Sequence, residues 1–253
     1  MSPTGRPEGE FRSAQHEGSP VSPTGRPEGE YRSAQHEGSP VNALADLDDG
    51  LARLQSAGAG LPEGLAPKLD AYLALLAKWN RTYNLTAIRE PERMVTHHAL
   101  DALAVLPHLP ARSALRMLDV GTGGGVPGIP LALARPGWRV VLLDSNHKKG
   151  AFLAQAAIEL GLANVEVATT RVEDYAPSAP FDVIISRAFS DLASFAGAAL
   201  PLLAPGGALV AMKGVLPHEE LAHLPADVRV VATPALSVPG LAAERHLVIM
   251  ERA

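Results

Sequence analysis

The sequence contains no cysteine among its 253 residues. This absence excludes a disulfide framework, a cysteine-based zinc site and a thiol nucleophile. Runs of about 18 consecutive apolar residues, the length that spans a bilayer, are also absent, and the N-terminus is polar from Ser2 onward. The sequence therefore predicts neither a membrane span nor a secretory signal, and we expect a cytoplasmic protein.

An excess of positive charge is absent as well. The formal net charge is −5 at pH 7, whereas nucleic-acid-binding proteins usually contact phosphates through clustered Lys and Arg. Any RNA partner must therefore be met by a local basic patch. Hydrophobic residues make up 47% of the chain, which is enough for a proper core, and the length is typical of one or two domains.

The beginning of the chain contains a tandem repeat. Residues 2–21 recur as residues 22–41 with a single difference, Phe11 against Tyr31. The repeated unit is rich in Pro, Gly, Ser and Glu, so it cannot bury enough apolar surface to offset the entropy lost on ordering. We predict a disordered tail over residues 1–41. The alternative is a peptide that docks on a partner.

Helical patterns follow the tail. Leucines recur at helical spacing over residues 44–54, a second helix follows Pro62, and a third begins near Pro91. Together these predict an N-terminal helical cap over residues 42–111.

The remainder, residues 112–253, alternates short apolar strands with helices. This alternation predicts an α/β fold with a parallel, doubly wound sheet that binds ligands beyond the carboxyl ends of its strands. The last two strands are separated by a loop, which favours an antiparallel hairpin at the sheet edge. The predicted strands are 115–120, 139–143, 165–168, 183–186, 208–212, 228–231 and 246–251.

A glycine-rich turn follows the first of these strands. Asp119 precedes glycines at positions 121, 123 and 125, which can take positive φ and bring peptide N–H groups close to a ligand. A dinucleotide-binding fingerprint needs its third glycine where this chain has Val126. The arrangement D-x-G-x-G-x-G instead resembles motif I of class I, Rossmann-like methyltransferases that use S-adenosylmethionine (AdoMet). The alternative is a tight turn that holds no ligand.

Asp144 closes the second strand. A carboxylate at this position can accept two hydrogen bonds from a ribose diol, a geometry shared by NAD and AdoMet sites. The other role open to it is the N-cap of the helix that begins near Asn146, and both roles could hold together.

The segment after the fourth strand reads Ser186-Arg187-Ala188-Phe189. Methyltransferases that act on exocyclic amines of bases typically carry Asn/Asp-Pro-Pro-aromatic there, and the missing cysteine removes the covalent route to pyrimidine C5. The methylated atom would then be one that can attack without first losing a proton, such as guanine N7, whose lone pair needs no deprotonation. For such a reaction the enzyme mainly positions the reactants and stabilises charge.

Several short motifs occur in the order and spacing of one family, and the match runs from Leu65 to the C-terminus. The chain resembles the bacterial small-subunit ribosomal RNA guanine-N7 methyltransferases, also called glucose-inhibited division protein B. It departs from the family pattern at Ala102, where serine is usual. The motifs are Trp79-Asn80-Arg81, Asn84-Leu85-Thr86, His98-Ala99-Leu100-Asp101, Val120-Gly121-Thr122-Gly123, Pro127-Gly128-Ile129-Pro130, Leu142-Leu143-Asp144-Ser145, Arg171-Val172-Glu173, Ser186-Arg187-Ala188-Phe189 and Lys213-Gly214.

The resemblance implies a cofactor, AdoMet, and a set of residues around it. Gly121 and Val126 would line the methionine and adenosine part, Asp144 to Asn146 would meet the ribose and the adenine edge, and Val172 and Glu173 would flank the adenine. Arg187 would lie at the mouth between cofactor and substrate, where it is the candidate for positioning substrate and charge. The predicted cofactor-binding residues are Asp119, Gly121, Gly123, Gly125, Val126, Asp144, Ser145, Asn146, Val172, Glu173 and Arg187.

A basic rim is also predicted at the carboxyl edge of the sheet. Lys148 and Lys149 begin the helix after Asp144, and Lys213 follows the fifth strand. These lysines and Asn84 are the candidate RNA contacts, although solvated surface lysines are the simpler interpretation of the pair. His98 and Asp101 lie three residues apart on one helical face, so we expect a hydrogen-bonded pair that joins cap to sheet. The histidines make no metal-ligand spacing, and no metal is expected.

The leading hypothesis is methylation of guanine N7 in 16S ribosomal RNA by a monomeric, AdoMet-dependent enzyme acting on the RNA or on the small ribosomal subunit. Two alternatives remain open: methylation of a small molecule or protein, and a non-catalytic module that binds AdoMet or RNA. An NAD oxidoreductase is the least favoured.

Overall fold

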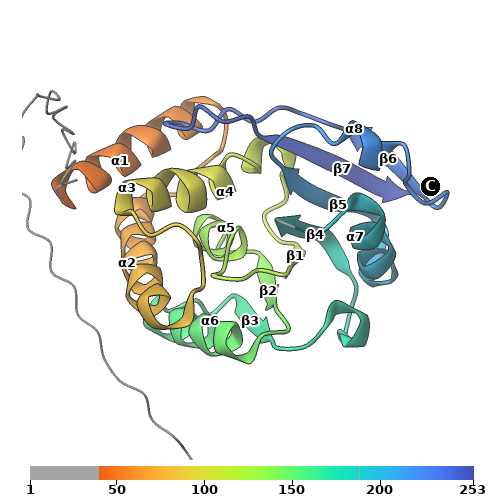
Figure 1. Ribbon diagram of the computed structural model, residues 1–253, viewed down its shortest axis with the longest axis horizontal. Helices are drawn as coiled ribbons and strands as arrows, with labels where there is room; N and C mark the ends of the chain where they lie inside the picture. The colour runs from red at the N-terminus through yellow and green to blue at the C-terminus, as the bar shows by residue number, and fades with distance from the viewer. Residues whose placement is uncertain (1–39, 188) are drawn as a thin grey trace, which may run out of the picture. The chain divides into compact units, whose positions relative to one another are not determined.

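The computed structural model describes residues 40–187 and 189–253 (Figure 1). Most of the predicted tail, residues 1–39, lies outside the described residues. The described residues belong to one compact unit, and the boundary that we predict between cap and core falls inside it. The fold can therefore be followed from the cap helices into the sheet without a break between domains.

Seven strands form one sheet in the described chain, in the order β3-β2-β1-β4-β5-β7-β6. The first five are parallel, and β7 pairs antiparallel with both β5 and β6. The predicted α/β class with an antiparallel edge hairpin is confirmed. The strands are β1 (Arg116–Val120), β2 (Arg139–Leu143), β3 (Val165–Ala168), β4 (Phe181–Arg187), β5 (Leu203–Lys213), β6 (Val228–Ala232) and β7 (His246–Arg252).

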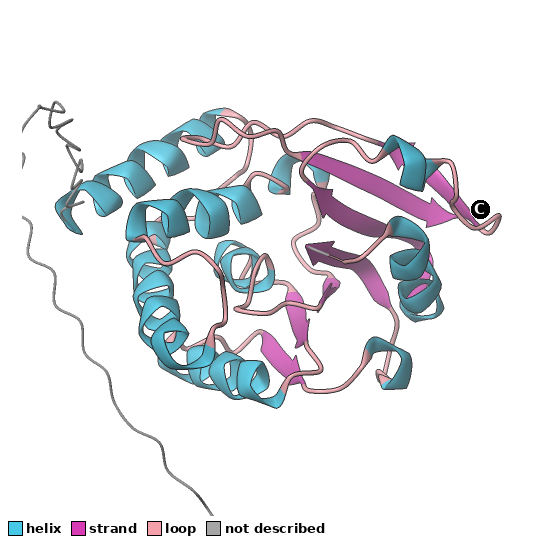
Figure 2. Cartoon of the chain, in the orientation of Figure 1, coloured by secondary structure: helices cyan, strands magenta, loops and turns pink. Residues whose placement is uncertain are grey.

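Both faces of the sheet are covered, which explains why its central strands are almost continuously apolar. Successive residues of β1 contribute to different cores: Met117 packs with the cap helices, α5 (Gly128–Ala134) and α6 (His147–Glu159), whereas Leu118 packs with α7 (Leu192–Ala199) on the other face. Figure 2 shows helices on both sides of the strands. The sequence pattern did not predict α8 (His218–Leu221), a short helix that lies beside α7.

The cap begins with α1 (Pro40–Ser56) and α2 (Leu65–Tyr83). The predicted third helix exists, but its middle is wider than an α-helix: α3 (Pro91–Met94) and α4 (Asp101–Leu103) flank a π-helical segment, η1 (Val95–Leu100). The Asp101 N–H donates to the carbonyl of Thr96, five residues back. Such segments insert an extra residue into a helical turn and are common at functional sites.

Helix α2 is fastened to the glycine turn by a buried hydrogen bond. The Tyr72 hydroxyl donates to the carbonyl oxygen of Gly124 at 2.7 Å, and burial raises the pKa of this hydroxyl well above its usual range. A Cβ at Gly124 would come within 2.9 Å of Leu76 Cδ1. The turn and α2 therefore pack together closely, and the cap fixes the position of the turn.

We expect Tyr72→Phe to lower the free energy of unfolding by about 1–2 kcal/mol, because it leaves the buried Gly124 carbonyl unpaired. Urea denaturation measures the change. Tyr83→Phe is the matched control: the Tyr83 ring is 42% exposed, and no described residue hydrogen-bonds its hydroxyl, so its loss should change stability by less than about 0.5 kcal/mol. Equal stabilities of the two variants would contradict the role of this bond.

Candidate active site

The buried side chain of Asp119 is hydrogen-bonded to two residues of the glycine turn. This fully buried carboxylate accepts hydrogen bonds through Oδ2 from the Thr122 hydroxyl at 2.5 Å and from the Gly128 N–H at 2.8 Å. A Cβ at Gly128 would collide with Leu142 and with this carboxylate, so glycine is required there. Asp119 lines neither of the cavities beside the turn; it shapes the turn that borders them.

The second oxygen of Asp119, Oδ1, is buried and has no hydrogen-bond partner among the described residues. Burial therefore raises the pKa of this carboxyl to about 6, although the bonds from Thr122 and Gly128 act in the opposite direction. The turn contains a carboxyl group that is costly to ionise.

The three glycines of the predicted motif have different local roles. All three have positive φ, of 70° at Gly121, 59° at Gly123 and 88° at Gly125. A Cβ at Gly121 would meet no atom within 4 Å, so this position opens onto the cavities, whereas a Cβ at Gly125 would collide with Ile129 of α5. At Gly123 the nearest atom to a Cβ is 3.9 Å away, so the positive φ is what requires glycine.

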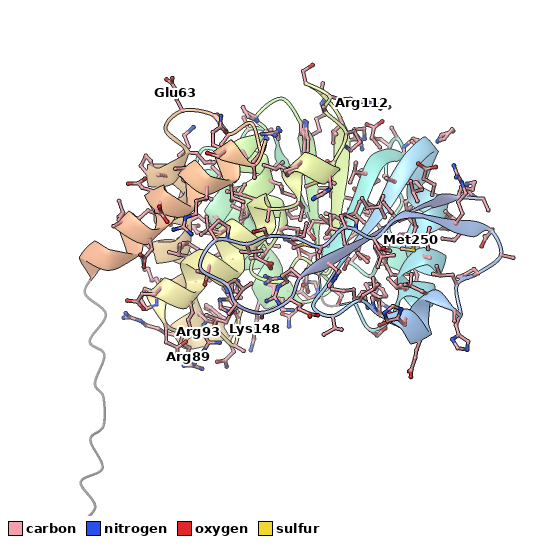
Figure 3. The ribbon with its side chains drawn as sticks, turned by 90° about the horizontal axis from the view of Figure 1, so that it is seen from above. Glu63, Arg89, Arg93, Arg112, Lys148 and Met250 are labelled. Carbon is pink, nitrogen blue, oxygen red and sulfur yellow. The ribbon has the colours of Figure 1, made fainter. Side chains whose placement is uncertain are left out.

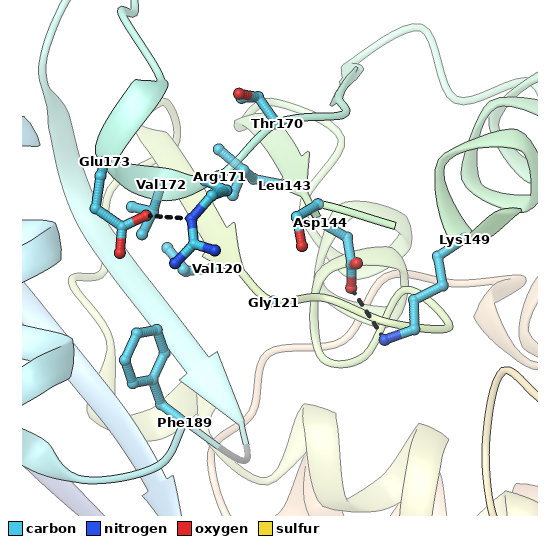
Figure 4. Close-up of a pocket in the computed structure, with 11 residues that line it drawn as sticks. Val120, Gly121, Leu143, Asp144, Lys149, Thr170, Arg171, Val172, Glu173 and Phe189 are labelled. Carbon is cyan, nitrogen blue, oxygen red and sulfur yellow. Dashed lines mark hydrogen bonds and ion pairs between the residues drawn. The ribbon is translucent and has the colours of Figure 1, made fainter. Parts of the chain in front are cut away.

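A first cavity of about 330 Å³ lies beyond the carboxyl ends of β1 and β2 (Figure 4). Five predicted residues line it: Gly121, Asp144, Ser145, Val172 and Glu173. Thr170, Arg171 and Phe189 line it too and were not predicted, although each lies within three residues of a predicted position. The other lining residues are Val120, Leu143 and Lys149.

Asp144 connects the glycine turn with α6. Its Oδ2 accepts from the Gly123 N–H at 3.0 Å and lies 3.3 Å from Lys149 Nζ, and its Oδ1 accepts from the Asn146 N–H at 2.9 Å. The helix is capped by Asn146, whose side chain accepts from the backbone N–H groups of Lys148 and Lys149, so the N-cap role for Asp144 is wrong. Asn146 lines neither cavity.

A second cavity of about 230 Å³ adjoins the first, since Gly121 and Lys149 line both. The predicted residues Gly123, Val126 and Arg187 line it, and the cap supplies the opposite wall. The cap residues are Leu76, Leu85, Thr86 and His98, and Thr122 and Gly124 complete the lining.

Arg187, at the end of β4, is held by the cap. Its Nη1 donates to the His97 carbonyl at 2.6 Å and lies 3.3 Å from Asp101 Oδ2. The other oxygen of the buried Asp101 lies 3.0 Å from Nε of Arg245. The predicted His98–Asp101 hydrogen bond is therefore wrong: Asp101 reaches the sheet through two arginines, and the π-helical segment directs it there.

His98 makes a separate contact within the cap. Its Nδ1 lies 3.0 Å from the His97 carbonyl and 3.4 Å from Arg187 Nη2; the shorter contact, to an oxygen that can only accept, favours the tautomer with the proton on Nδ1, in which Nε2 accepts from the Thr86 hydroxyl at 3.0 Å. Burial, and next the charge of Arg187, lower the pKa of His98 to about 4. The imidazole is therefore neutral near pH 7.

The loop between α2 and α3 is organised by Asn80, the central residue of the Trp79-Asn80-Arg81 motif. Its Oδ1 accepts from the Thr86 N–H at 2.9 Å, and Thr86 Oγ1 accepts from the Ile88 N–H at 3.1 Å. These bonds hold Thr86 against the second cavity. The sequence motif singled out this loop, and the structure shows the reason: Asn80 positions Thr86 at the cavity wall.

The predicted basic rim is largely neutralised by neighbouring carboxylates. Lys149 pairs with Asp144, Lys213 Nζ lies 2.8 Å from Glu220 Oε2, and Arg187 pairs with Asp101. Lys148 is exposed and has no ion pair within the described ranges. Lys148, Lys213 and Asn84 line neither cavity.

The two cavities differ in their lining. The first combines apolar side chains with the carboxylates of Asp144 and Glu173, and the second lies between the glycine turn and the cap. The order of the strands, with a glycine turn after β1, is that of the class I, Rossmann-like methyltransferase fold. The structure titled MtNAS in complex with MTA and tNA shares the fold, with a TM-score of 0.50 at 14% identity over 74% of this chain and 73% of that chain.

Comparison of sequences identifies the family. The family described as rRNA small subunit methyltransferase G (GidB) matches residues 65–248, and the chain belongs to it. The protein of that name from Nitrosospira multiformis is 55% identical over 219 residues, which cover 84% of this chain and 99% of the relative. The one from Chromobacterium violaceum is 56% identical over 206 residues, covering 81% and 96%. The chain is thus a methyltransferase, with AdoMet as its methyl donor.

Two further observations concern what the described chain lacks. None of its helices is long and apolar enough to cross a membrane. Its His, Asp and Glu side chains form no group of three or more that could hold a metal ion.

The raised pKa of Asp119 predicts that its contribution to the free energy of unfolding depends on pH. Because the native pKa of about 6 exceeds the ordinary value of about 3.9, the stabilising contribution of this group is complete below pH 4 and is lost as the pH rises through 6. Asp119→Asn keeps the two accepted hydrogen bonds without the charge. Its unfolding free energy, relative to the parent protein, should rise by about 3 kcal/mol between pH 4 and pH 7. A difference that stays constant with pH would contradict the buried charge.

The Asp101 contacts predict a graded loss of activity. Asp101→Asn removes the charge that holds Arg187 and Arg245, so kcat should fall about tenfold or more because Arg187 is displaced at the cavity. Arg245→Gln leaves the Asp101–Arg187 pair intact and should cost less. Methyl-transfer kinetics on both variants test this order, and the reverse order would exclude Asp101 as the residue that positions Arg187.

Proposed function

We propose that this protein transfers the methyl group of AdoMet to N7 of a guanine in the RNA of the small ribosomal subunit. Family membership supports the RNA substrate, since the relatives are named ribosomal RNA small subunit methyltransferase G. The lining of the second cavity supports N7 as the methylated atom. No carboxylate is among its described lining residues, and the lone pair of His98 Nε2 is already hydrogen-bonded. A nucleophile that must lose a proton has no base there, whereas guanine N7 needs none.

The transfer is a single displacement. The N7 lone pair forms a bond to the methyl carbon as the carbon–sulfur bond breaks and its electron pair goes to sulfur. The products are a positively charged 7-methylguanine and S-adenosylhomocysteine, and no proton moves. The work of the protein is therefore to align the reactants and to exclude water.

The adenosine half of AdoMet is proposed to occupy the first cavity. Asp144 would accept hydrogen bonds from the ribose hydroxyls in place of Lys149, with Ser145 beside it, and Val172 and Phe189 would pack on the adenine near Glu173. Gly121, Gly123 and Val126 would border the methionine half. Asp119, Gly125 and Asn146 support the site from behind. AdoMet supplies the electrophilic methyl group at the junction of the cavities.

Arg187 is proposed to hold the guanine. Its guanidinium is partly exposed; Nη1 bonds the cap and Nη2 lies 3.4 Å from His98 Nδ1, so the Nε–H and one Nη2–H remain to donate to guanine O6, next to N7. The His97 carbonyl and Asp101 fix the plane of the group. We further propose that the protein works as a monomer, and that it does so in the cytoplasm, because the relatives it matches are named for ribosomal RNA.

The test is incubation of the protein with methyl-labelled AdoMet and small-subunit RNA, naked or assembled. We expect label in 7-methylguanine at one position. Arg187→Lys keeps the charge but loses the planar fork, so it should lower kcat/KM for RNA about 10- to 100-fold and change AdoMet affinity less. Label only in small molecules or protein would favour that substrate class, and tight AdoMet binding without transfer would favour the non-catalytic module.

A further inference from the structure

The cations that line the cavities are engaged in ion pairs, so other residues are better candidates for contacts with RNA phosphates. Exposed polar and basic residues lie further out, at the C-terminal end of α2, in the loop after it and at the N-terminal end of α6. In Figure 3, Arg89, Arg93 and Lys148 lie together on one side of the molecule, away from Glu63 near the other end of α2. An exposed aromatic ring, that of Tyr83, belongs to the same region.

Tyr83 has the features of a stacking platform. Its ring is 42% exposed and lies against Trp79 with centroids 5.2 Å apart. Trp79 in turn packs edge-on against the buried Phe152 of α6, at 5.7 Å. The Tyr83 ring is thus packed on Trp79, which is itself held by Phe152, while part of the Tyr83 residue faces solvent.

This region borders the second cavity. Leu85, Thr86 and Lys149 line that cavity. Tyr83 precedes Leu85 by two residues, Arg89 follows Thr86 by three, and Lys148 precedes Lys149 by one. Since consecutive Cα atoms are about 3.8 Å apart, each lies within about 12 Å of a residue in the cavity wall.

The side chain of Arg89 is oriented by a hydrogen bond to Asn84. Asn84 ends α2 in a left-handed conformation with φ of 50°, and its Oδ1 accepts from Arg89 Nη2 at 3.1 Å. The neighbouring acid, Glu90, lies 3.4 Å from Arg93 and so is partly neutralised. Asn84, a predicted RNA contact, therefore acts on this surface by orienting Arg89.

We propose that Tyr83, Arg89 and Lys148 form a docking surface for single-stranded RNA next to the target guanine. Tyr83 stacks on an unpaired base, and the two cations contact phosphates on either side of it. Recognition of RNA single strands typically combines an aromatic platform with flanking cations, and that combination favours RNA over a protein partner here. The inference rests on the proposed function, because it assumes an RNA substrate.

The test measures RNA affinity and methyl transfer for Tyr83→Ala, Arg89→Ala and Lys148→Ala in the full chain, with naked small-subunit RNA and assembled subunits in parallel. Tyr83→Ala should raise KM for RNA about 5- to 100-fold with kcat and AdoMet affinity unchanged. Each cation variant should reduce the slope of log affinity against log salt by about 0.7.

Two variants serve as controls. Tyr83→Phe retains the ring and should bind RNA as the parent protein does. Lys68→Ala removes an exposed lysine near the other end of α2, about 22 Å away along the helix, and should leave both affinity and salt slope unchanged.

The outcomes separate the two proposals. If the parent protein methylates RNA and the Tyr83, Arg89 and Lys148 variants bind RNA as tightly as it does, the docking surface is wrong and the proposed function stands. If the variants lose activity on assembled subunits while their affinity for naked RNA is unchanged, the surface contacts a ribosomal protein, which also overturns the proposal. If the parent protein does not methylate RNA in either form, both proposals fall.

Discussion

The buried carboxylate of Asp119 is the constraint on which the site depends. Its two hydrogen bonds join the start of the glycine turn to its middle at Thr122 and to its end at Gly128. The chain thereby keeps an acid whose ionisation is opposed by burial, because the turn it shapes carries Gly121, the residue common to both cavities. The energetic cost of burying the Asp119 carboxyl thus accompanies a turn that holds Gly121 at the wall of both cavities.

The cap is part of the active site as much as the sheet is. Tyr72 bonds the turn itself, Thr86 and His98 form a wall of the second cavity, and Asp101 holds the arginine at the end of β4. The cations that line the cavities each have a carboxylate partner: Arg187 pairs with Asp101, Lys149 with Asp144 and Arg171 with Glu173. The Asp101–Arg187 pair is preorganised and needs little rearrangement when the substrate binds, whereas the proposed ribose contact requires Lys149 to leave Asp144.

The sequence predicted the parts of the fold that depend on local pattern. The bounds of β2 and β3 agree with prediction because each is a short apolar run between turns, and the parallel order follows from the alternation with helices. The Asp101–Arg187 pair was missed because it joins residues 86 positions apart and depends on a π-helical turn that no periodicity marks. The Asn146 cap could have been predicted from the sequence, because asparagine is a common residue immediately before a helix.

The acidic total charge and an RNA substrate are compatible once the charges are located. A net charge of −5 weakens the long-range attraction to any polyanion, so indiscriminate binding to cellular RNA is disfavoured. Affinity must then come from contacts that need a particular shape: a base free to stack and a guanine that can reach Arg187. Stacking is less sensitive to salt than phosphate contact and requires an unpaired base. On the proposed function, an enzyme of acidic net charge would thus gain selectivity for an exposed guanine in single-stranded RNA over the large excess of double-helical RNA.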